Sequence, residues 1–425
     1  MESFVNISLG EKIRQIRVAK GLSQENLAHA VKCSVATINR IENGKTECIG
    51  KILADIKKSL AVENAPLLPS EREVYKARLL IYNDWLSAGR VADVETMLGK
   101  MSCVIDLPFE QDLILMFTLI ETRLLIKDFD ISAAEEKLKQ AEVYLNKVSD
   151  ETLHMYFYVK GLCYHYQRDI ESALKYYLKA CTHEKSSLDL MLQINIGMCY
   201  FHLGRPIQAI VLLENIKTKY PMDSSHPTAH HLVYIIASCY ALIGEYSKAK
   251  KMFDEVIIPV RILNSRFAAG EILSNMGLMY IKMKKYGESI NLCNEALTYL
   301  PAEWIGYRVT LYQKGLALLK MNKPGECNEV IAHGLFISEG DELSAISFNA
   351  LKHLMTLNDA ASIDYILHIA VPHLRNAGIF KFQALDLCKA LEEHYYKKRA
   401  KTKALAIAAI IREIYEEIFL GDIVN

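Results

Sequence analysis

The sequence predicts an all-α protein in which a small N-terminal domain of short helices is followed by a long array of paired helices. Apolar residues recur at helical spacing along the 425-residue chain, without the alternation that strands show. A segment containing two prolines, 61–69, interrupts this pattern because proline cannot continue a helix. Beyond it, small and large residues recur at a fixed period, which indicates a repeat architecture.

Composition places the chain among cytosolic globular proteins. Hydrophobic residues make up 51% of the sequence, which excludes a disordered chain. The apolar runs are too short for a membrane span, so we expect no membrane partner. Residues 1–6 lack the basic start and apolar core of a signal peptide. The ten cysteines contain no Cys-x-x-Cys pair, so free thiols are expected instead of a zinc or redox site.

The charge is unevenly distributed. Residues 1–62 contain ten Lys or Arg and six Asp or Glu, a net charge of +4 in a chain whose total is zero. The remainder therefore carries −4. A basic module on a mildly acidic body is expected when only one end of a protein meets phosphate.

The N-terminal helices can be placed from their end signals. Ser8 and Glu11 form a capping box for a first helix that Gly21 ends. Ser23 caps a second helix, 24–31, and Ser34 caps a third, 35–42, which Asn43 and Gly44 end. A fourth covers 47–60. We expect a helix-turn-helix domain at 1–62, a linker at 63–70 and the helical array at 71–425.

Two segments carry a specific resemblance. Lys20-Gly21-Leu22-Ser23-Gln24-Glu25-Asn26-Leu27-Ala28 and Ser34-Val35-Ala36-Thr37-Ile38-Asn39-Arg40-Ile41-Glu42-Asn43-Gly44-Lys45 resemble the phage-repressor type of helix-turn-helix. The resemblance implies that 35–40 form the recognition helix in the major groove, with Gln24 at the front of the preceding helix. It also implies a structural ion pair between Arg17 and Glu42.

Residue chemistry suggests how this helix meets double-stranded DNA. Arg40 can donate two hydrogen bonds to guanine, whereas Val35 and Ala36 can only contact a thymine methyl. The side chains suited to phosphate are Ser34, Thr37, Asn39, Asn43 and Lys45. Ile16, Leu27, Ile38 and Ile41 are expected in the core. The alternative is a bundle that docks a protein instead of DNA.

The array repeats every 36 to 40 residues or so, slightly longer than a tetratricopeptide repeat. A small residue, a large one three positions later and a second small one twelve positions after the first recur in the clearest units. These are Gly161, Tyr164, Ala173; Gly197, Tyr200, Ala209; Ala237, Tyr240, Ala249; and Gly277, Tyr280, Ser289. Looser units extend the frame to about nine, predicting a right-handed superhelix with a concave groove.

Amides recur two positions before the small residue, at Asn195, Asn275, Gln313 and Asn349. An amide there can pair the N–H and C=O of an extended peptide. The alternative is that this repeat position simply favours asparagine. Other side chains expected to line the same groove are Tyr158, His165, Met198, His202, Tyr234, Tyr312, Phe348 and Lys352.

No pattern of catalytic, metal-binding or cofactor-binding residues stands out, so we expect neither an enzyme nor a cofactor. His226, His230 and His231 are expected in a solvated loop without metal-ligand spacing. Cys163 and His165 point to different helical faces, which argues against a nucleophile pair. The basic run 397–403 is expected in an interhelix turn.

A helix-turn-helix followed by tetratricopeptide units is similar to the RRNPP family of Gram-positive quorum-sensing regulators, most of all its NprR-type branch. This resemblance implies a transcription regulator controlled by a short peptide in the groove and acting as a homodimer or larger homo-oligomer. Two alternatives stay open. One is an adaptor that sequesters a protein partner such as a response regulator, and the other is a prophage-type repressor that needs no peptide.

Overall fold

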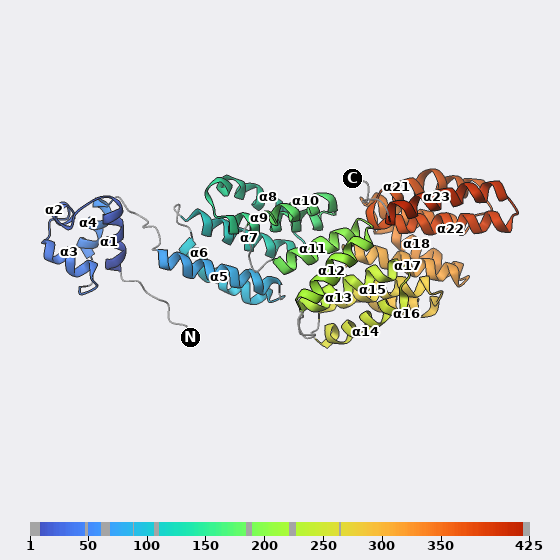
Figure 1. The fold of residues 1–425 in the computed structure, drawn as a ribbon, viewed down its shortest axis with the longest axis horizontal. Coiled ribbons are helices and arrows are strands. Elements are labelled where there is room, and N and C mark those ends of the chain that lie inside the picture. Colours follow the sequence, from blue (N-terminus) through green and yellow to red (C-terminus); the bar gives the residue numbers. More distant parts are fainter. Residues whose placement is uncertain are drawn as a thin grey trace. The chain divides into compact units, whose positions relative to one another are not determined.

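The computed structural model describes residues 9–46, 50–60, 69–87, 89–105, 110–183, 189–220, 227–262 and 265–419. Every regular element within these ranges is helical (Figure 1). The predicted all-α fold is therefore confirmed. None of the helices in the described ranges is long and apolar enough to span a bilayer.

Four short helices form the N-terminal domain: α1 (Leu9–Ala19), α2 (Gln24–Ala30), α3 (Val35–Glu42) and α4 (Gly50–Ser59). The Ser23 hydroxyl accepts the Asn26 N–H and the Ser34 hydroxyl accepts the Thr37 N–H, so both predicted N-caps are confirmed. Gly21 follows α1 with a φ of 68°, a conformation that suits glycine. Ser8 and residues 47–49 lie outside the described ranges, as do 63–68 of the predicted linker.

The core of this domain brings all four helices together. Leu27 and Ile38 are fully buried, and Ile41 joins them, as the sequence predicts. Ile16 is half-buried against this core. Ile56 and Leu60 are also buried, so α4 and the residue that follows it contribute to the same core. Apolar burial on this scale fixes the orientation of α3 within the domain.

The rest of the described chain consists of helix pairs. Their members are α5 (Pro69–Ser87) and α6 (Val91–Ile105), α7 (Gln111–Lys127) and α8 (Ile131–Ala141), α9 (Asp150–Tyr166) and α10 (Ile170–Ala180), α11 (Asp189–His202) and α12 (Pro206–Lys219), α13 (Pro227–Leu242) and α14 (Tyr246–Ile262), α15 (Arg266–Lys282) and α16 (Tyr286–Leu297), α17 (Ile305–Lys320) and α18 (Pro324–Phe336), α19 (Glu342–Leu354) and α20 (Ala360–Tyr365), and α22 (Lys381–Lys397) and α23 (Lys401–Phe419). Shorter elements are η1 (Glu142–Lys147), η2 (Ile366–Ala370), α21 (Val371–Arg375) and η3 (Gly378–Phe380).

The predicted small residues lie where helices approach closely. A Cβ on Gly197 would come within 2.4 Å of the Leu213 side chain, and one on Gly315 within 2.6 Å of Leu351. A Cβ on Gly277 would lie 3.0 Å from the Cys293 sulfur. Larger side chains at these positions would push neighbouring helices apart, which explains why the repeat frame depends on small residues.

The turn inside most pairs contains one residue with a left-handed backbone. In the described turns these are Gly89, Phe129, Arg168, Gly204, Gly244, Lys284, Asn322 and Arg399, with φ between 56° and 92°. Arg399 lies in the turn between α22 and α23, so the prediction for the basic run 397–403 is confirmed only for 398–400, because Lys397 ends α22 and residues 401–403 begin α23. The pair that begins with α19 differs, because its second half is divided into α20, the π-helical η2 and α21.

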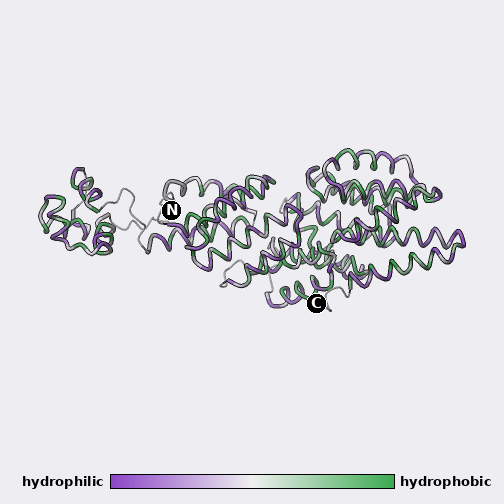
Figure 2. The backbone as a smooth tube through the Cα atoms, turned by 90° about the horizontal axis from the view of Figure 1, so that it is seen from above, coloured by the Kyte–Doolittle hydropathy of each residue, from purple (hydrophilic) through white to green (hydrophobic). Residues whose placement is uncertain are grey.

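The described chain forms two compact units. Unit 1 comprises Met1–Arg168 and Leu178–Leu188, and unit 2 comprises Asp169–Tyr177 and Asp189–Asn425. Figure 2 shows apolar and polar residues alternating around the helices of each unit. The apolar faces of unit 2 form three core clusters, centred on α11–α16, α17–α19 and α19–α23. Amphipathic helices of this kind are stable only when neighbouring pairs cover their apolar faces.

Candidate nucleic-acid and peptide interfaces

One face of α3 is open to solvent. Ile38 and Ile41 turn into the core, whereas Val35, Ala36, Asn39 and Arg40 are exposed. Their spacing places these four side chains on a single helical face. Val35 is 42% exposed, a high value for an aliphatic side chain at the start of a packed helix. An apolar side chain held in solvent at this place is suited to contact a thymine methyl.

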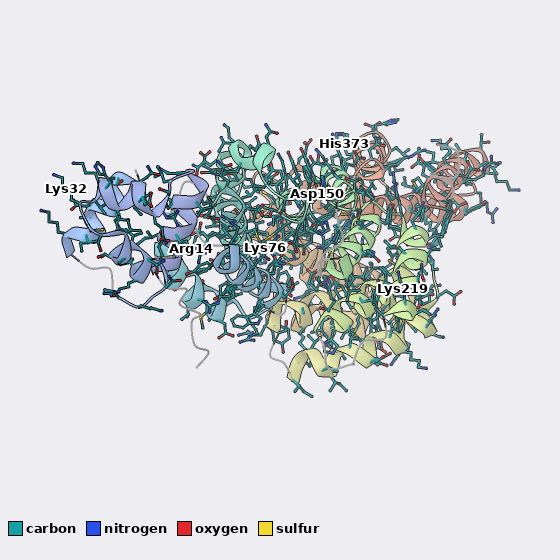
Figure 3. All side chains as sticks on the ribbon, turned by 60° about the vertical axis from the view of Figure 1, so that its left-hand side comes forward. Arg14, Lys32, Lys76, Asp150, Lys219 and His373 are labelled. Carbon is teal, nitrogen blue, oxygen red and sulfur yellow. The ribbon has the colours of Figure 1, made fainter. Side chains whose placement is uncertain are left out.

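The Arg40 side chain is open to solvent and points away from the core. Its guanidinium makes no hydrogen bond or ion pair with the described residues, although many other arginines of the chain do. Asn43 and Lys45 are likewise exposed beyond the end of α3, whereas the Ser34 and Thr37 hydroxyls lie 2.8 Å apart and bond each other. Figure 3 labels Arg14 and Lys32, two further cations of the same domain. The face of α3 therefore combines an available guanidinium with polar side chains at its edges.

A buried ion pair fixes α3 against α1. Arg17 Nε lies 2.6 Å from Glu42 Oε1 and Arg17 Nη2 lies 2.9 Å from Oε2, which confirms the pair implied by the resemblance. Arg17 also donates to the Leu22 carbonyl at 2.6 Å. Burial alone would raise the pKa of Glu42, but hydrogen bonds from Arg17 and Gln24 and the Arg17 charge lower that pKa overall. Glu42 therefore has a structural role in this domain, because it holds α3 against α1.

Gln24 is bonded at both ends of its amide. Its Nε2 donates to Glu42 Oε2 at 2.7 Å, and its Oε1 accepts from Asn39 Nδ2 at 3.3 Å. Asn43 Nδ2 in turn donates to Asn39 Oδ1 at 3.1 Å. A chain of side-chain bonds thus leads from the buried carboxylate to the exposed face of α3. The sequence did not reveal this chain, because its members lie up to 19 residues apart. Gln24 as a direct DNA contact stays a prediction.

The four predicted groove amides differ in their surroundings. Asn195 is buried and Asn275 is half-buried. Gln313 is only 3% exposed, and its Oε1 is buried without a hydrogen-bond partner among the described residues. Asn349 is half-buried and lies beside Tyr365, where its amide opposes the rise that burial causes in the pKa of the Tyr365 hydroxyl. Gln313 is therefore an unsatisfied acceptor, which costs stability in the free protein.

Several aromatic side chains predicted to line the groove are in the core instead. Phe348 is completely buried and contacts Gly334 of α18, where a Cβ would lie 2.3 Å from its ring. Tyr312 is buried beside it, with ring centroids 6.3 Å apart. The prediction was wrong here because large side chains fill the layer between the two helices of a pair, where small residues leave room.

Tyr158 of unit 1 is also buried, with the Arg123 guanidinium 5.5 Å from its ring centroid. Tyr234 is 9% exposed and stacks on His231 at a centroid distance of 5.4 Å. His165 is half-buried, and burial lowers its pKa to about 4. Met198 and His202 are half-buried and Lys352 is exposed. These last four side chains stay candidates for contact with a ligand.

The histidine cluster was placed wrongly. His230 and His231 belong to α13, and His230 is buried, whereas the sequence suggested a solvated loop. His226 lies outside the described residues. Within the described ranges, no three His, Cys, Asp or Glu side chains are grouped to hold a metal ion. Burial raises the pKa of the Cys163 thiol to about 11, which disfavours the reactive thiolate.

Two family models match parts of the chain. A helix-turn-helix model matches residues 13–47, and a tetratricopeptide-repeat model matches residues 156–182. The first contains the whole of α2 and α3, and the second contains α10 and the end of α9. No curated protein matches the sequence.

Solved structures share the fold. A Rap protein in complex with competence and sporulation factor has 16% sequence identity and a TM-score of 0.70, covering 81% of this chain and 99% of that chain. NprR in complex with its cognate peptide NprX has 22% identity and a TM-score of 0.60, covering 80% and 99%. The apo form of the quorum sensor NprR from B. thuringiensis has 22% identity and a TM-score of 0.56, covering 81% and 99%. The predicted resemblance to RRNPP regulators is thus confirmed for the fold.

Proposed function

We propose that this chain is a DNA-binding transcription regulator whose activity is controlled by a short peptide bound on the inner face of its repeat array. The observation that supports DNA binding most directly is the exposed face of α3, where Arg40 has no partner in the described structure. A guanidinium in that state is available for bidentate hydrogen bonds to guanine. The net charge of +4 over residues 1–62 would attract the phosphate backbone.

Peptide control is supported by the repeat fold and by the amides of unit 2. The NprR structure named above holds its cognate peptide NprX. In this chain Asn195, Asn275, Gln313 and Asn349 recur at one repeat position, and Gln313 has a buried acceptor that a peptide N–H could satisfy. A homodimer would place two α3 helices on half-sites about one DNA turn apart, since one such helix binds weakly. These features are consistent with a cytosolic regulator without a catalytic step.

The DNA claim is tested by selection from genomic fragments. The wild-type protein is used to enrich fragments at fixed salt, and the enriched fragment is titrated with Arg40→Ala and with Lys57→Ala. We expect Arg40→Ala to weaken binding by about 1–3 kcal/mol and to relax base preference at one position. Lys57→Ala removes an exposed charge at the end of α4 and should lower affinity uniformly. Undiminished binding by Arg40→Ala would contradict this recognition helix.

The peptide claim is tested with a pool of random heptapeptides, with retained species identified by mass spectrometry. We expect the double variant Asn195→Ala with Asn275→Ala to lose most of the retained peptides. The matched control is Asn294→Ala with Asn328→Ala, which changes two exposed amides on α16 and α18. Equal retention by both variants would favour the repressor that needs no peptide.

The adaptor alternative makes a different prediction. The alignment with the Rap structure covers 81% of this chain at a TM-score of 0.70, so this fold is not confined to the NprR structures named above. An adaptor would bind its protein partner equally well with Arg40→Ala. It would also enrich no genomic fragment, whereas a transcription regulator would.

A further inference from the structure

The segment from Gly378 to Lys397, which comprises η3 and α22, crosses to helices far earlier in unit 2. Lys282 Nζ, at the end of α15, donates to Asp386 Oδ1 at 2.6 Å although the residues are 104 positions apart. The two side chains are only 23% and 27% exposed. Ser347 of α19 donates to Gln383 Oε1 at 2.8 Å. α22 is therefore bonded to the first helices of two earlier pairs.

The start of this segment touches the end of α11 through backbone atoms. Gly378 has a φ of 55°, and a Cβ there would lie 2.4 Å from the His202 carbonyl oxygen. A Cβ on Gly204 would lie 3.0 Å from the Gly378 carbonyl oxygen. Ile379 packs against both the α11–α16 cluster and the α19–α23 cluster. A side chain at 378 would not fit here, so the close backbone approach depends on glycine at this position.

The far end of α22 faces a third pair of helices. The hydrogen bond from Lys397 and its charge lower the pKa of Glu393, and the charges of Lys320 and Lys284 add to this effect. Lys320 ends α17 and Lys284 lies in the turn after α15. Packing and hydrogen bonds thus connect the segment to the ends of α11 and α15, and positive charges surround its far end.

The residues that this segment faces share a register. His202, Lys282 and Lys320 each lie seven positions after a predicted groove amide, namely Asn195, Asn275 and Gln313. Seven residues are two helical turns, so each pair of positions lies on one helical face about 10 Å apart along the axis. The segment therefore lies beside helical faces that also carry the predicted groove amides.

We propose that η3 and α22 form an internal clasp that borders the peptide site of unit 2 and holds its curvature, and that opening this clasp transmits peptide binding to the rest of the chain. The inference rests on the proposed function. A solenoid bends by small rotations that add up along its repeats, so a contact between its fourth and later pairs opposes any change of curvature. A peptide bound beside the row of amides shifts the equilibrium between the closed and the open clasp only if it binds these two states with different affinity.

Glycine substitutions test the clasp directly. Gly378→Ala introduces a Cβ that must displace the His202 backbone, whereas Gly340→Ala, at a φ of 79°, has nothing within 4 Å. Both variants force alanine into a left-handed conformation, so their difference isolates the contact. Hydrogen exchange of the full chain, followed by mass spectrometry, should be faster by about tenfold at 199–204 and 381–388 in Gly378→Ala only. Equal exchange in both variants would overturn the clasp.

The ion pair offers an independent measurement. Lys282→Ala and Asp386→Ala should each speed exchange at 381–388, and the charge swap Lys282→Asp with Asp386→Lys should restore slow exchange. The control pair is Lys250 and Asp254, an exposed i, i+4 pair on α14 whose alanine variants should leave those peptides unchanged. A swap that fails to restore protection, or a control that matches the single variants, would count against the clasp.

The regulatory role is decided with the DNA fragment that the wild-type protein enriches. Gly378→Ala should change affinity for this fragment about fivefold or more relative to Gly340→Ala, the usual size of coupling between sites. Faster exchange with unchanged DNA affinity would reduce the clasp to a structural contact and overturn the proposal. If the wild-type protein enriches no fragment, the proposed function fails, whereas the exchange measurements still decide whether the clasp exists.

Discussion

The exposed face of α3 and the inner face of unit 2 differ in how their polar groups are satisfied. On α3, Arg40 and Lys45 have no partner in the described structure, and the backbone beneath them is fixed by a buried core. In the proposed groove of unit 2, Lys282 is paired with Asp386, and Gln313 offers a buried acceptor. The Arg40 guanidinium is thus open to a ligand, whereas a peptide in the proposed groove would compete with an internal ion pair for part of that surface.

This difference suits a regulator whose two sites have different tasks. A preformed surface binds without reorganisation, so its affinity depends on the contacts it makes and on salt. A surface that must break internal hydrogen bonds or ion pairs to bind a ligand gains less net affinity. Each broken bond, however, can shift the protein toward another conformation. The comparison predicts that substitutions on the exposed face of α3 alter binding alone, whereas substitutions in the proposed groove of unit 2 alter binding and stability together.

The largest expected effect is on the free energy of unfolding, and it tests whether an aromatic side chain of unit 2 belongs to the core or to the groove. Phe348→Ala should lower the free energy of unfolding by about 3–5 kcal/mol, because a fully buried ring leaves a cavity. Phe336→Ala, on the neighbouring α18, removes a ring that is 81% exposed and should cost less than about 0.5 kcal/mol. Urea denaturation followed by circular dichroism measures both. If Phe348→Ala kept full stability and lost only peptide retention, Phe348 would belong to the groove after all.

The next effect concerns the scaffold beneath α3. Glu42→Ala leaves the Arg17 guanidinium buried without its carboxylate and should destabilise the N-terminal domain by about 3–5 kcal/mol. Glu25→Ala, an exposed carboxylate on α2, is the control and should change little. Hydrogen exchange at residues 24–42 should rise in Glu42→Ala while exchange in unit 2 stays the same. A uniform rise in both regions would show that the domain and the array unfold together.

The same carboxylate predicts a pH dependence. The pKa of Glu42 is lowered in the folded protein, with Arg17 and Gln24 hydrogen bonds outweighing burial. Its contribution to stability is therefore complete above the unfolded carboxyl pKa of about 4.3 and is lost as the pH falls through the lower folded value. Stability of residues 24–42 should fall with acid in the wild type and respond less in Glu42→Ala. An identical acid response in both proteins would argue against the assignment.

The sequence was sufficient for features that rest on local signals. Ser23 and Ser34 cap α2 and α3 where they were expected, and Arg17 pairs with Glu42 as the resemblance implies. The repeat frame also placed Gly197 and Gly277 at close helix contacts. Each of these depends on residues within one motif or on a spacing that repeats, so a single sequence contains the information.

Features that depend on the summed geometry of many repeats could not be predicted. The Lys282–Asp386 pair joins residues 104 positions apart, and their approach follows from the rotation of every pair between them. The sequence also does not show whether a large side chain points into the core or into the groove. Phe348 turns to the layer that Gly334 leaves open, although its position in the repeat suggested the groove. The left-handed turn residues Arg168, Lys284 and Arg399 could not be predicted either, because lysine and arginine give no sequence signal for that conformation.

The smallest effect tests the comparison most directly. Gln313 holds a buried acceptor without a partner among the described residues, so Gln313→Leu should raise the free energy of unfolding by about 1 kcal/mol. The same variant should retain fewer heptapeptides if that acceptor exists to receive a peptide N–H. A gain of stability with a loss of binding is the expected signature of a site that is left unsatisfied for its ligand. Gln208→Leu on α12 is the control for a glutamine outside the amide row, and it should leave peptide retention unchanged. A variant at 313 that became more stable and kept all its peptides would make Gln313 a core defect, and the row of amides would then depend on Asn195 and Asn275 alone.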